Sequence, residues 1–180
     1  MAKKQKKKKH QGKKSKKGRK RPSLSNVQRE AERCVLESLK ETPGYKSLER
    51  RSVPIGDDGA HLTPGGLTQA NRRMIGVYAR TGSLHGAHGR EVAAEILKFA
   101  TIRQQPGFEN TRGELYFIDQ EALASVRDWQ REAANRFGIE LKLAEEFPGS
   151  LRENLLLAQE AQADDSKAKV KKGKKKKKKK

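Results

Sequence analysis

Two histidines stand three positions apart in a glycine-containing stretch, GSLHGAHGRE, at residues 82–91. Imidazole nitrogens bind zinc and transfer protons near neutral pH, and glycines let backbone N–H groups approach an anion closely. His85 and His88 therefore raise three functional hypotheses: a metal site, an acid–base pair and a phosphate-binding loop. A mobile turn between two helices is the fourth interpretation, and the one that the spacing favours.

Each chemical hypothesis lacks part of its usual motif. The glycine spacing matches neither the P-loop nor the dinucleotide-binding fingerprint, and H-E-x-x-H is absent. A third zinc ligand would have to come from His61, Cys34 or a distant acid, so we predict no metal site and no cofactor. A glycine-rich loop also holds a catalytic pair with little rigidity. We assign no catalytic residue and keep His85 and His88 as the only candidates.

Arginines surround this stretch. Residues 60–90 contain Arg72, Arg73, Arg80 and Arg90 but no acidic residue. Guanidinium groups and the N–H groups at a helix N-terminus both attract phosphate. We expect these four arginines to form a contact patch for a nucleic-acid backbone.

The net charge of +20 is concentrated at the two ends of the chain. Residues 1–22 contain eleven lysines, two arginines and no acid, and residues 167–180 contain eleven lysines and no acid. Residues 23–166 contain 18 basic and 22 acidic residues, a net charge of −4. A mildly acidic body thus lies between two polycationic segments.

We expect both terminal segments to be disordered in isolation, because they have little apolar surface to offset chain entropy. They contain no Phe, Tyr or Trp for base stacking, which leaves attraction to phosphate, without sequence specificity. The predicted nucleic-acid-binding residues of these segments are Lys6, Lys7, Lys8, Lys9, Lys13, Lys14, Lys16, Lys17, Arg19, Lys20, Arg21, Lys171, Lys172, Lys174, Lys175 and Lys176.

These charges favour a non-catalytic nucleic-acid-associated protein whose body adds specific contacts. Chromatin or a nucleoid, ribosomal RNA and a packaged genome are all suitable settings, and the sequence does not choose between DNA and RNA. Two alternatives stay open. The body could be a nucleic-acid-processing enzyme with a His/Arg site. It could instead be a protein-interaction module in which residues 106–166, with thirteen acidic and six basic residues, dock a basic partner.

Several classes of protein are not expected. The single Cys34 rules out an intramolecular disulfide and a multi-cysteine zinc motif. No apolar run is long enough to span a bilayer, and the basic N-terminal segment has no apolar core of a secretory signal. We expect a soluble intracellular protein without membrane binding. It would lie in the nucleus or nucleolus of a eukaryote, or in the cytoplasm or nucleoid of a bacterium.

The hydrophobic pattern predicts one folded domain at 23–166, flanked by disordered segments at 1–22 and 167–180. Apolar residues recur at helical spacing over 24–41, 67–79, 90–103, 119–137 and 150–163. Alternating residues at 113–118 and 139–144 indicate strands, and a short edge strand is possible at 51–55. The result is a helix-rich α/β or α+β domain with a two- to three-stranded sheet.

The strand–helix–strand segment near the C-terminus is the clearest unit in this pattern. A helix between two strands makes them parallel neighbours with a right-handed connection. Trp129 falls on the apolar stripe of that helix, so we predict that it is buried in the core. Cys34 lies beside the apolar face of the first helix and is predicted to be a small buried residue.

Overall fold

The computed structural model describes the backbone of residues 23–177 and the side chains of residues 23–163. The predictions for residues 1–22, and for the lysine side chains after residue 163, lie outside the described residues. Within the part of the chain that is described, no helix has the length and apolar character needed to cross a lipid bilayer.

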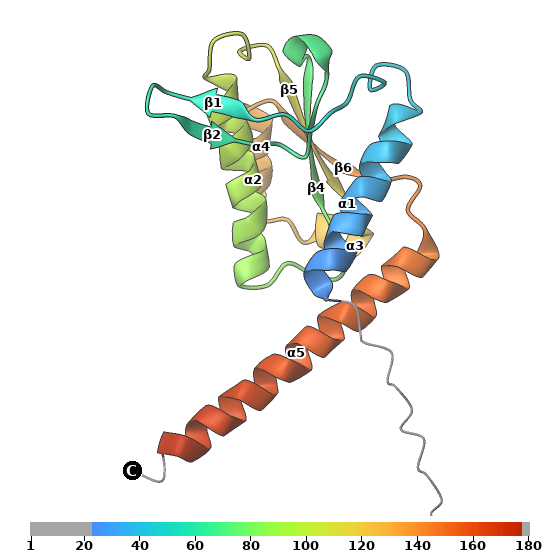
Figure 1. Cartoon of the computed structure of the whole chain (residues 1–180), viewed down its shortest axis with the longest axis vertical. Coiled ribbons are helices and arrows are strands. Elements are labelled where there is room, and N and C mark those ends of the chain that lie inside the picture. The colour runs from blue at the N-terminus through green and yellow to red at the C-terminus, as the bar shows by residue number, and fades with distance from the viewer. Residues whose placement is uncertain (1–22, 178–180) are drawn as a thin grey trace, which may run out of the picture.

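A four-stranded sheet forms the centre of the fold. Its order is β3-β4-β5-β6; β3 is antiparallel to β4, while β4, β5 and β6 are mutually parallel. A separate antiparallel hairpin lies beside α2 (Figure 1). The strands are β1 (Val53–Ile55), β2 (Ala60–Leu62), β3 (Gly66–Leu67), β4 (Arg73–Tyr78), β5 (Arg112–Phe117) and β6 (Ile139–Leu143).

Helices cover both faces of this sheet, so the fold has three layers (Figure 1). One face packs against α1 and α5, and the other against α2, α3 and α4. The helices are α1 (Leu24–Lys40), α2 (Ala87–Arg103), α3 (Gln120–Ala124), α4 (Asp128–Arg136) and α5 (Gly149–Lys177). The predicted mixed, helix-rich fold class and the parallel strand–helix–strand unit are confirmed.

The central strand β5 divides its side chains between the two layers. Leu115 and Phe117 lie in the core against α2, whereas Glu114 and Tyr116 face α1. Successive strand residues point to opposite faces, and both faces are covered, so all four are buried. This alternation places a charged residue inside the layer between α1 and the sheet.

The helix predicted at 67–79 is wrong, and the sheet has one more strand than the upper limit predicted. This segment forms β3, a turn and β4. Ala70 and Asn71 adopt φ angles of 60° and 55°, which end the first strand in a tight turn. The run Met74–Tyr78 is apolar on both sides because β4 is covered on both faces, and such a run resembles a helical stripe.

The single helix predicted at 119–137 is interrupted at residues 125–127, which separate α3 from α4. Gln130 lies in the first turn of α4 and caps it: its Oε1 accepts from Arg127 N–H at 3.2 Å, and its Nε2 donates to Gly89 O at 2.7 Å. Because its amide has hydrogen-bond partners, the Gln130 side chain is buried against the core. The neighbouring Trp129 lies on the outer side of the helix, with 57% of its surface exposed. The predicted burial of Trp129 is therefore wrong.

The first and last helices follow their predicted faces in part. Val27, Ala31 and Val35 are buried as expected, while Cys34 is only half-buried. The backbone of α5 continues past the predicted end near residue 163 to Lys177, into the segment assigned to a tail. The predicted edge strand at 51–55 is present as β1, with Pro54 inside it.

Candidate functional site

The four arginines predicted to form one patch lie at different places on the body. Arg72 and Arg73 stand at the start of β4, and Arg80 follows its end. A six-residue strand separates them by about 20 Å. Arg90 is exposed and lies near the start of α2. The predicted patch is thus spread over two ends of the sheet.

Two of these arginines already form ion pairs. Arg73 Nη1 contacts the buried carboxylate of Glu114. Arg80 forms a two-point contact with Glu91, at 2.9 Å from Nε and 3.1 Å from Nη2. Paired guanidinium groups attract phosphate less than free ones, since the carboxylate offsets their charge. Of the four predicted arginines, only Arg72 and Arg90 are exposed.

The loop before α2 is tied to α3 through its own backbone N–H groups. Gly82 N–H donates to Asp119 Oδ2 at 3.0 Å, and Leu84 N–H donates to Ser125 Oγ at 2.8 Å. The Ser83 hydroxyl donates to Glu121 at 2.6 Å. Two of the N–H groups that could have cradled a phosphate therefore have protein partners, one of them a carboxylate.

His85 and His88 lie at the entry to α2 without an orienting side chain. His85 is exposed, and its carbonyl accepts from His88 N–H at 3.0 Å. Among the described residues, neither imidazole has a hydrogen-bond partner, and no three His, Cys, Asp or Glu side chains gather where they could hold a metal ion. A general base needs such a partner to fix its tautomer and direction.

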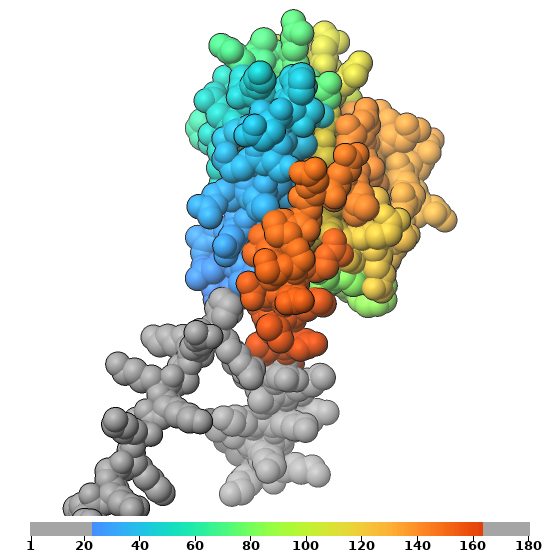
Figure 2. Space-filling model, turned by 90° about the vertical axis from the view of Figure 1, so that its right-hand side faces the viewer, coloured from blue at the N-terminus to red at the C-terminus, as the bar shows by residue number. Residues whose placement is uncertain are grey.

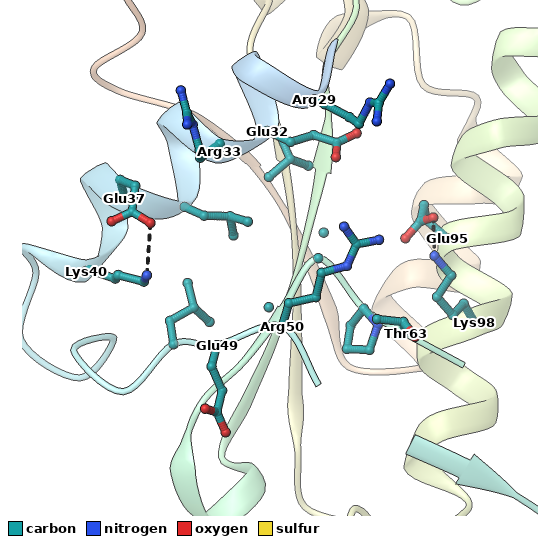
Figure 3. A pocket seen from close by; sticks show the side chains of 17 residues that line it. Arg29, Glu32, Arg33, Glu37, Lys40, Glu49, Arg50, Thr63, Glu95 and Lys98 are labelled. Atoms are coloured by element: carbon teal, nitrogen blue, oxygen red, sulfur yellow. Dashed lines mark hydrogen bonds and ion pairs between the residues drawn. The ribbon is translucent and has the colours of Figure 1, made fainter. Parts of the chain in front are cut away.

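A cleft of about 500 Å³ lies between α1, the segment around Arg50, and α2 (Figure 3). Gly65, Gly66, Gly76 and Val77 form part of its lining, where β3 begins and β4 continues past it. Nine charged side chains surround it, five of them basic: Arg29, Arg33, Lys40, Arg50, Lys98, Glu32, Glu37, Glu49 and Glu95.

The lysines and the arginines of this cleft differ in how they are paired. Lys40 contacts Glu37 at 2.9 Å and Lys98 contacts Glu95 at 2.5 Å. By contrast, Arg29, Arg33 and Arg50 form no ion pair with a carboxylate among the described residues. Arg29 donates to two neutral oxygens near the start of α1, Ser25 O at 3.2 Å and Asn26 Oδ1 at 2.7 Å. The guanidinium groups of Arg33 and Arg50 are thus the two available at this opening, and such groups suit phosphate oxygens.

Glu32 lies half-buried on α1 facing this cleft, and Arg50 extends from the opposite side toward it (Figure 3). Burial raises the pKa of Glu32, the charge of Arg50 opposes that rise, and the Glu95 carboxylate adds to it. Glu32 is therefore the acidic group that faces Arg50 across the cleft.

A second polar cluster is buried under α1, around Glu114. The hydroxyls of Tyr45 and Tyr116 donate to Glu114 Oε2 at 2.8 and 2.9 Å, and Lys142 Nζ lies 3.3 Å from the same oxygen. Arg73 contacts the other oxygen. Every carboxylate contact comes from a donor, so this cluster has the character of a fixed structural network.

Part of this network borders a cavity of about 820 Å³ between the C-terminal half of α1 and β6. Tyr45, Tyr116 and Lys142 line it from the sheet side. Glu41, Glu145 and Glu146 also line it, so acidic groups outnumber the single lysine. This cavity is a poorer place for phosphate than the cleft with two available arginines.

Sequence reasoning missed Arg29, Arg33 and Arg50. Arg29 and Arg33 are four residues apart and share one face of α1, which was a usable signal. Arg50 joins them only through tertiary structure: Glu49 N–H and C=O pair with Leu67, and this pairing fixes the neighbouring residue beside β3. No periodicity in residues 45–66 indicated that contact.

Comparison with known proteins adds no relative: no family model, curated protein or solved structure matches the chain.

Proposed function

We propose that this chain is a non-catalytic nucleic-acid-associated protein. Its lysine-rich ends neutralise backbone phosphates, and the arginines of the cleft between α1 and α2 give the folded body its own phosphate contact. The proposal rests on one observation, the position of the lysine-rich N-terminal segment next to the helix that bears two arginines of the cleft. The lysine-rich residues 1–22 lead directly into α1, the helix that bears Arg29 and Arg33.

The packing of α1 against α5 supports the joint action of the two ends. Leu24, at the start of α1, and Ala158 of α5 belong to one buried cluster, and the two helices lie side by side. In Figure 2 the first residues of α1 and the last described side chains of α5 occupy the same end of the body. Both polycationic segments are therefore attached near one pole, where they can act on the same duplex.

The mechanism is the release of counterions from the nucleic acid. If about eight terminal lysines engage duplex phosphates, log K falls with log salt at a slope of about −7. Residues 23–166 carry a net charge of −4, so the body repels phosphate except where unpaired basic groups gather. The cleft then fixes the orientation of the folded body on the nucleic acid, while the terminal segments supply most of the affinity for it.

This function suits the nucleus or nucleolus of a eukaryote, or the cytoplasm or nucleoid of a bacterium. Chromatin, ribosomal RNA and a packaged genome present the same phosphate chemistry. The proposal names no base contact, because the described body has no exposed aromatic cluster near the cleft. Binding to DNA and RNA is thus expected to differ through backbone geometry alone.

The test measures binding of the full chain to duplex DNA, duplex RNA and single strands by fluorescence anisotropy across a salt series. A variant with eight N-terminal lysines changed to glutamine keeps the length and the folded body. We expect its salt slope to be shallower by several units than that of the wild type. The variant residues are Lys6, Lys7, Lys8, Lys9, Lys13, Lys14, Lys16 and Lys17.

Two outcomes would contradict the proposal. The first is that the full chain shows no affinity for any nucleic acid at low salt. The second is that the eight-lysine variant binds with the affinity and salt slope of the wild type. Thermal unfolding of both proteins serves as the control, because a change outside the folded body should leave the melting temperature unchanged.

A further inference from the structure

The last strand of the sheet, β6, has an open edge. It pairs only with β5 on its inner side, where Gly113 N–H donates to Gly138 O and Ala144 N–H donates to Phe117 O. Strand residues alternate in the direction of their backbone groups, so those of Ile139, Leu141 and Leu143 point away from β5. Among the described residues, these three have no backbone hydrogen-bond partner beyond the sheet.

The side chains of β6 alternate between the two faces of the sheet. Ile139 and Leu141 pack toward the core that α4 covers, while Glu140 and Lys142 point to the opposite face. Lys142 Nζ lies 2.8 Å from Glu140 Oε2, and 55% of the Glu140 side chain is exposed. One face of the edge thus shows an acid and a base two residues apart.

We propose that β6 pairs antiparallel with β6 of a second copy of this chain, about a twofold axis at Leu141. The two four-stranded sheets then join into one continuous sheet of eight strands. Such an interface uses the same surface on both subunits, so each pair of residues occurs twice.

The hydrogen-bond geometry of β6 agrees with this register. Pairing Leu141 with its own copy brings Ile139 opposite the partner's Leu143, and all of these residues point their backbone groups outward. They form the hydrogen-bonded pairs of an antiparallel ladder. Glu140 and the partner's Lys142 fall in the non-hydrogen-bonded position, where side chains approach most closely.

Charge complementarity selects this register over its neighbours. A shift in one direction places Glu140 opposite a second Glu140, and a shift in the other direction places Lys142 opposite a second Lys142. Like charges directly opposite each other destabilise a strand pair, whereas opposite charges stabilise it. Only the register centred on Leu141 pairs both acids with both bases.

Exposed apolar side chains flank the same edge. Phe137, two residues before the start of β6, is 41% exposed, and Leu143 is 37% exposed. Trp129 lies on α4, which packs against β6. Figure 2 shows α4 and the segment after β6 at the surface of the body. Edge strands often carry a proline, a bulge or charged residues that oppose pairing, and β6 has only the charges of Glu140 and Lys142. These two charges are complementary in the register centred on Leu141, so they oppose other pairings more than this one.

The test measures the mass of the nucleic-acid-free full chain by analytical ultracentrifugation over a range of protein concentrations. We expect a species of twice the 20.2 kDa chain mass that dissociates on dilution. Glu140→Lys places Lys opposite the partner's Lys142 at two symmetric positions, so we expect the dimer Kd to rise about tenfold. Glu153→Lys makes the same charge change at an exposed position of α5 and should leave the Kd within about twofold.

Amide hydrogen exchange locates the interface. In the dimer, the N–H groups of Leu141 and Leu143 should exchange more slowly as protein concentration rises, because they become hydrogen-bonded. A chain that stays monomeric at the highest concentration reached would overturn the proposal. A dimer would also overturn it if the Glu140 and Glu153 variants weakened it equally, or if these amides exchanged at one rate throughout.

Discussion

The hydroxyl of Tyr45 donates to Glu114 Oε2 at 2.8 Å, although the two residues are 69 positions apart in the chain. This contact joins the segment after α1 to the central strand β5. Glu114 is fully buried, and both of its oxygens are held by donors from three other parts of the fold. The carboxylate thus fixes the segment after α1 to the sheet, while α1 itself packs through Val27, Ala31 and Val35.

Replacing Glu114 with glutamine should destabilise the protein by about 1–3 kcal/mol, because the buried hydrogen bonds to the carboxylate are weakened and Arg73 loses its carboxylate partner. The cost stays below that of a fully buried ion pair, since Arg73 and Lys142 are partly exposed and Lys142 keeps Glu140. Urea unfolding followed by circular dichroism measures this difference. Glu153→Gln is the matched control, since Glu153 is exposed, and it should change the free energy of unfolding by less than about 0.5 kcal/mol. Equal stability of the two variants would show that the cluster contributes little.

The same carboxylate makes stability depend on acid pH. Burial alone would raise the pKa of Glu114, but hydrogen bonds from Tyr45, Tyr116 and Arg73 and the charge of Lys142 bring it below the ordinary value of 4.5. A group with a lowered pKa adds stability above its unfolded pKa, and this contribution is lost as the pH falls through the folded pKa. The free energy of unfolding should therefore drop below about pH 4.5.

The Glu114→Gln variant provides the control for this pH effect. It has no carboxyl group to titrate at position 114, so its deficit relative to the wild type should be largest near pH 7 and should shrink as the pH falls below the ordinary value of 4.5. Urea titrations at several pH values measure that difference. A deficit that is constant from neutral to acid pH would be inconsistent with a lowered pKa.

The sequence predicted strands correctly where apolar and polar residues alternate clearly, and it failed at β4. Alternation over 113–118 and 139–144 identified β5 and β6, because each strand mixes large and small or charged residues on its two faces. β4 was mistaken for helix because the turn before it depends on positive φ at Ala70 and Asn71, so no glycine or proline marks the boundary between β3 and β4. Such a turn is set by tertiary contacts and not by glycine.

Asp119 connects three elements, so its loss should have a larger effect than that of an ordinary helix cap. Its Oδ2 accepts from Gly82 N–H and Ala122 N–H, and its Oδ1 accepts from Arg152 at 2.8 Å. Asp119→Ala should cost about 1–3 kcal/mol of stability, since two buried donors lose their acceptor. Urea unfolding measures the cost.

Hydrogen exchange distinguishes the roles of Asp119. In the Asp119→Ala variant, the amide of Gly82 should exchange faster, while amides of β5 should change only as global stability does. Asp128→Ala is the control, because Asp128 is exposed in the first turn of α4 and its side chain forms no hydrogen bond or ion pair among the described residues. An unchanged Gly82 amide would mean that the loop is held by other contacts.

Gly113 lies where no larger residue fits. A Cβ atom there would stand 2.9 Å from both Phe99 and Ile139 side chains, which are packed in the core between β5 and α2. Gly113→Ala should therefore destabilise the protein by about 1–3 kcal/mol. Gly89→Ala, inside α2 with open space around it, should instead stabilise by about 0.5–1 kcal/mol. Thermal unfolding of both variants measures the contrast.

The lining of one cleft by Arg33 and Arg50 shows why this site could not be predicted. Arg33 lies on a helix with a clear apolar stripe, so its exposed position was foreseeable. Arg50 belongs to a segment without a period, and its place depends on the bridge between Glu49 and Leu67. Charge along the sequence favoured Arg72 and Arg90, since residues 60–90 contain no acid. Charge in space depends on which elements pack together.

The arginines of the cleft and the exposed arginines outside it should contribute differently to nucleic-acid binding. Changing Arg33 and Arg50 together to glutamine removes two unpaired guanidinium groups from the cleft, so the salt slope for duplex DNA should become shallower by about 2 and affinity should fall about tenfold. Anisotropy titrations of the full chain measure both quantities. Arg72→Gln with Arg90→Gln removes the same charge from exposed positions outside the cleft.

This second double variant is therefore a matched control for net charge. If the cleft makes a specific contact, the control should lose less than about threefold in affinity, because charges far from the bound phosphate are screened beyond about 10 Å at 0.1 M salt. Equal losses in the two variants would mean that net charge alone determines affinity. A larger loss in the Arg72 and Arg90 variant would place the contact at the patch first indicated by the sequence, and would remove the cleft from the proposed function.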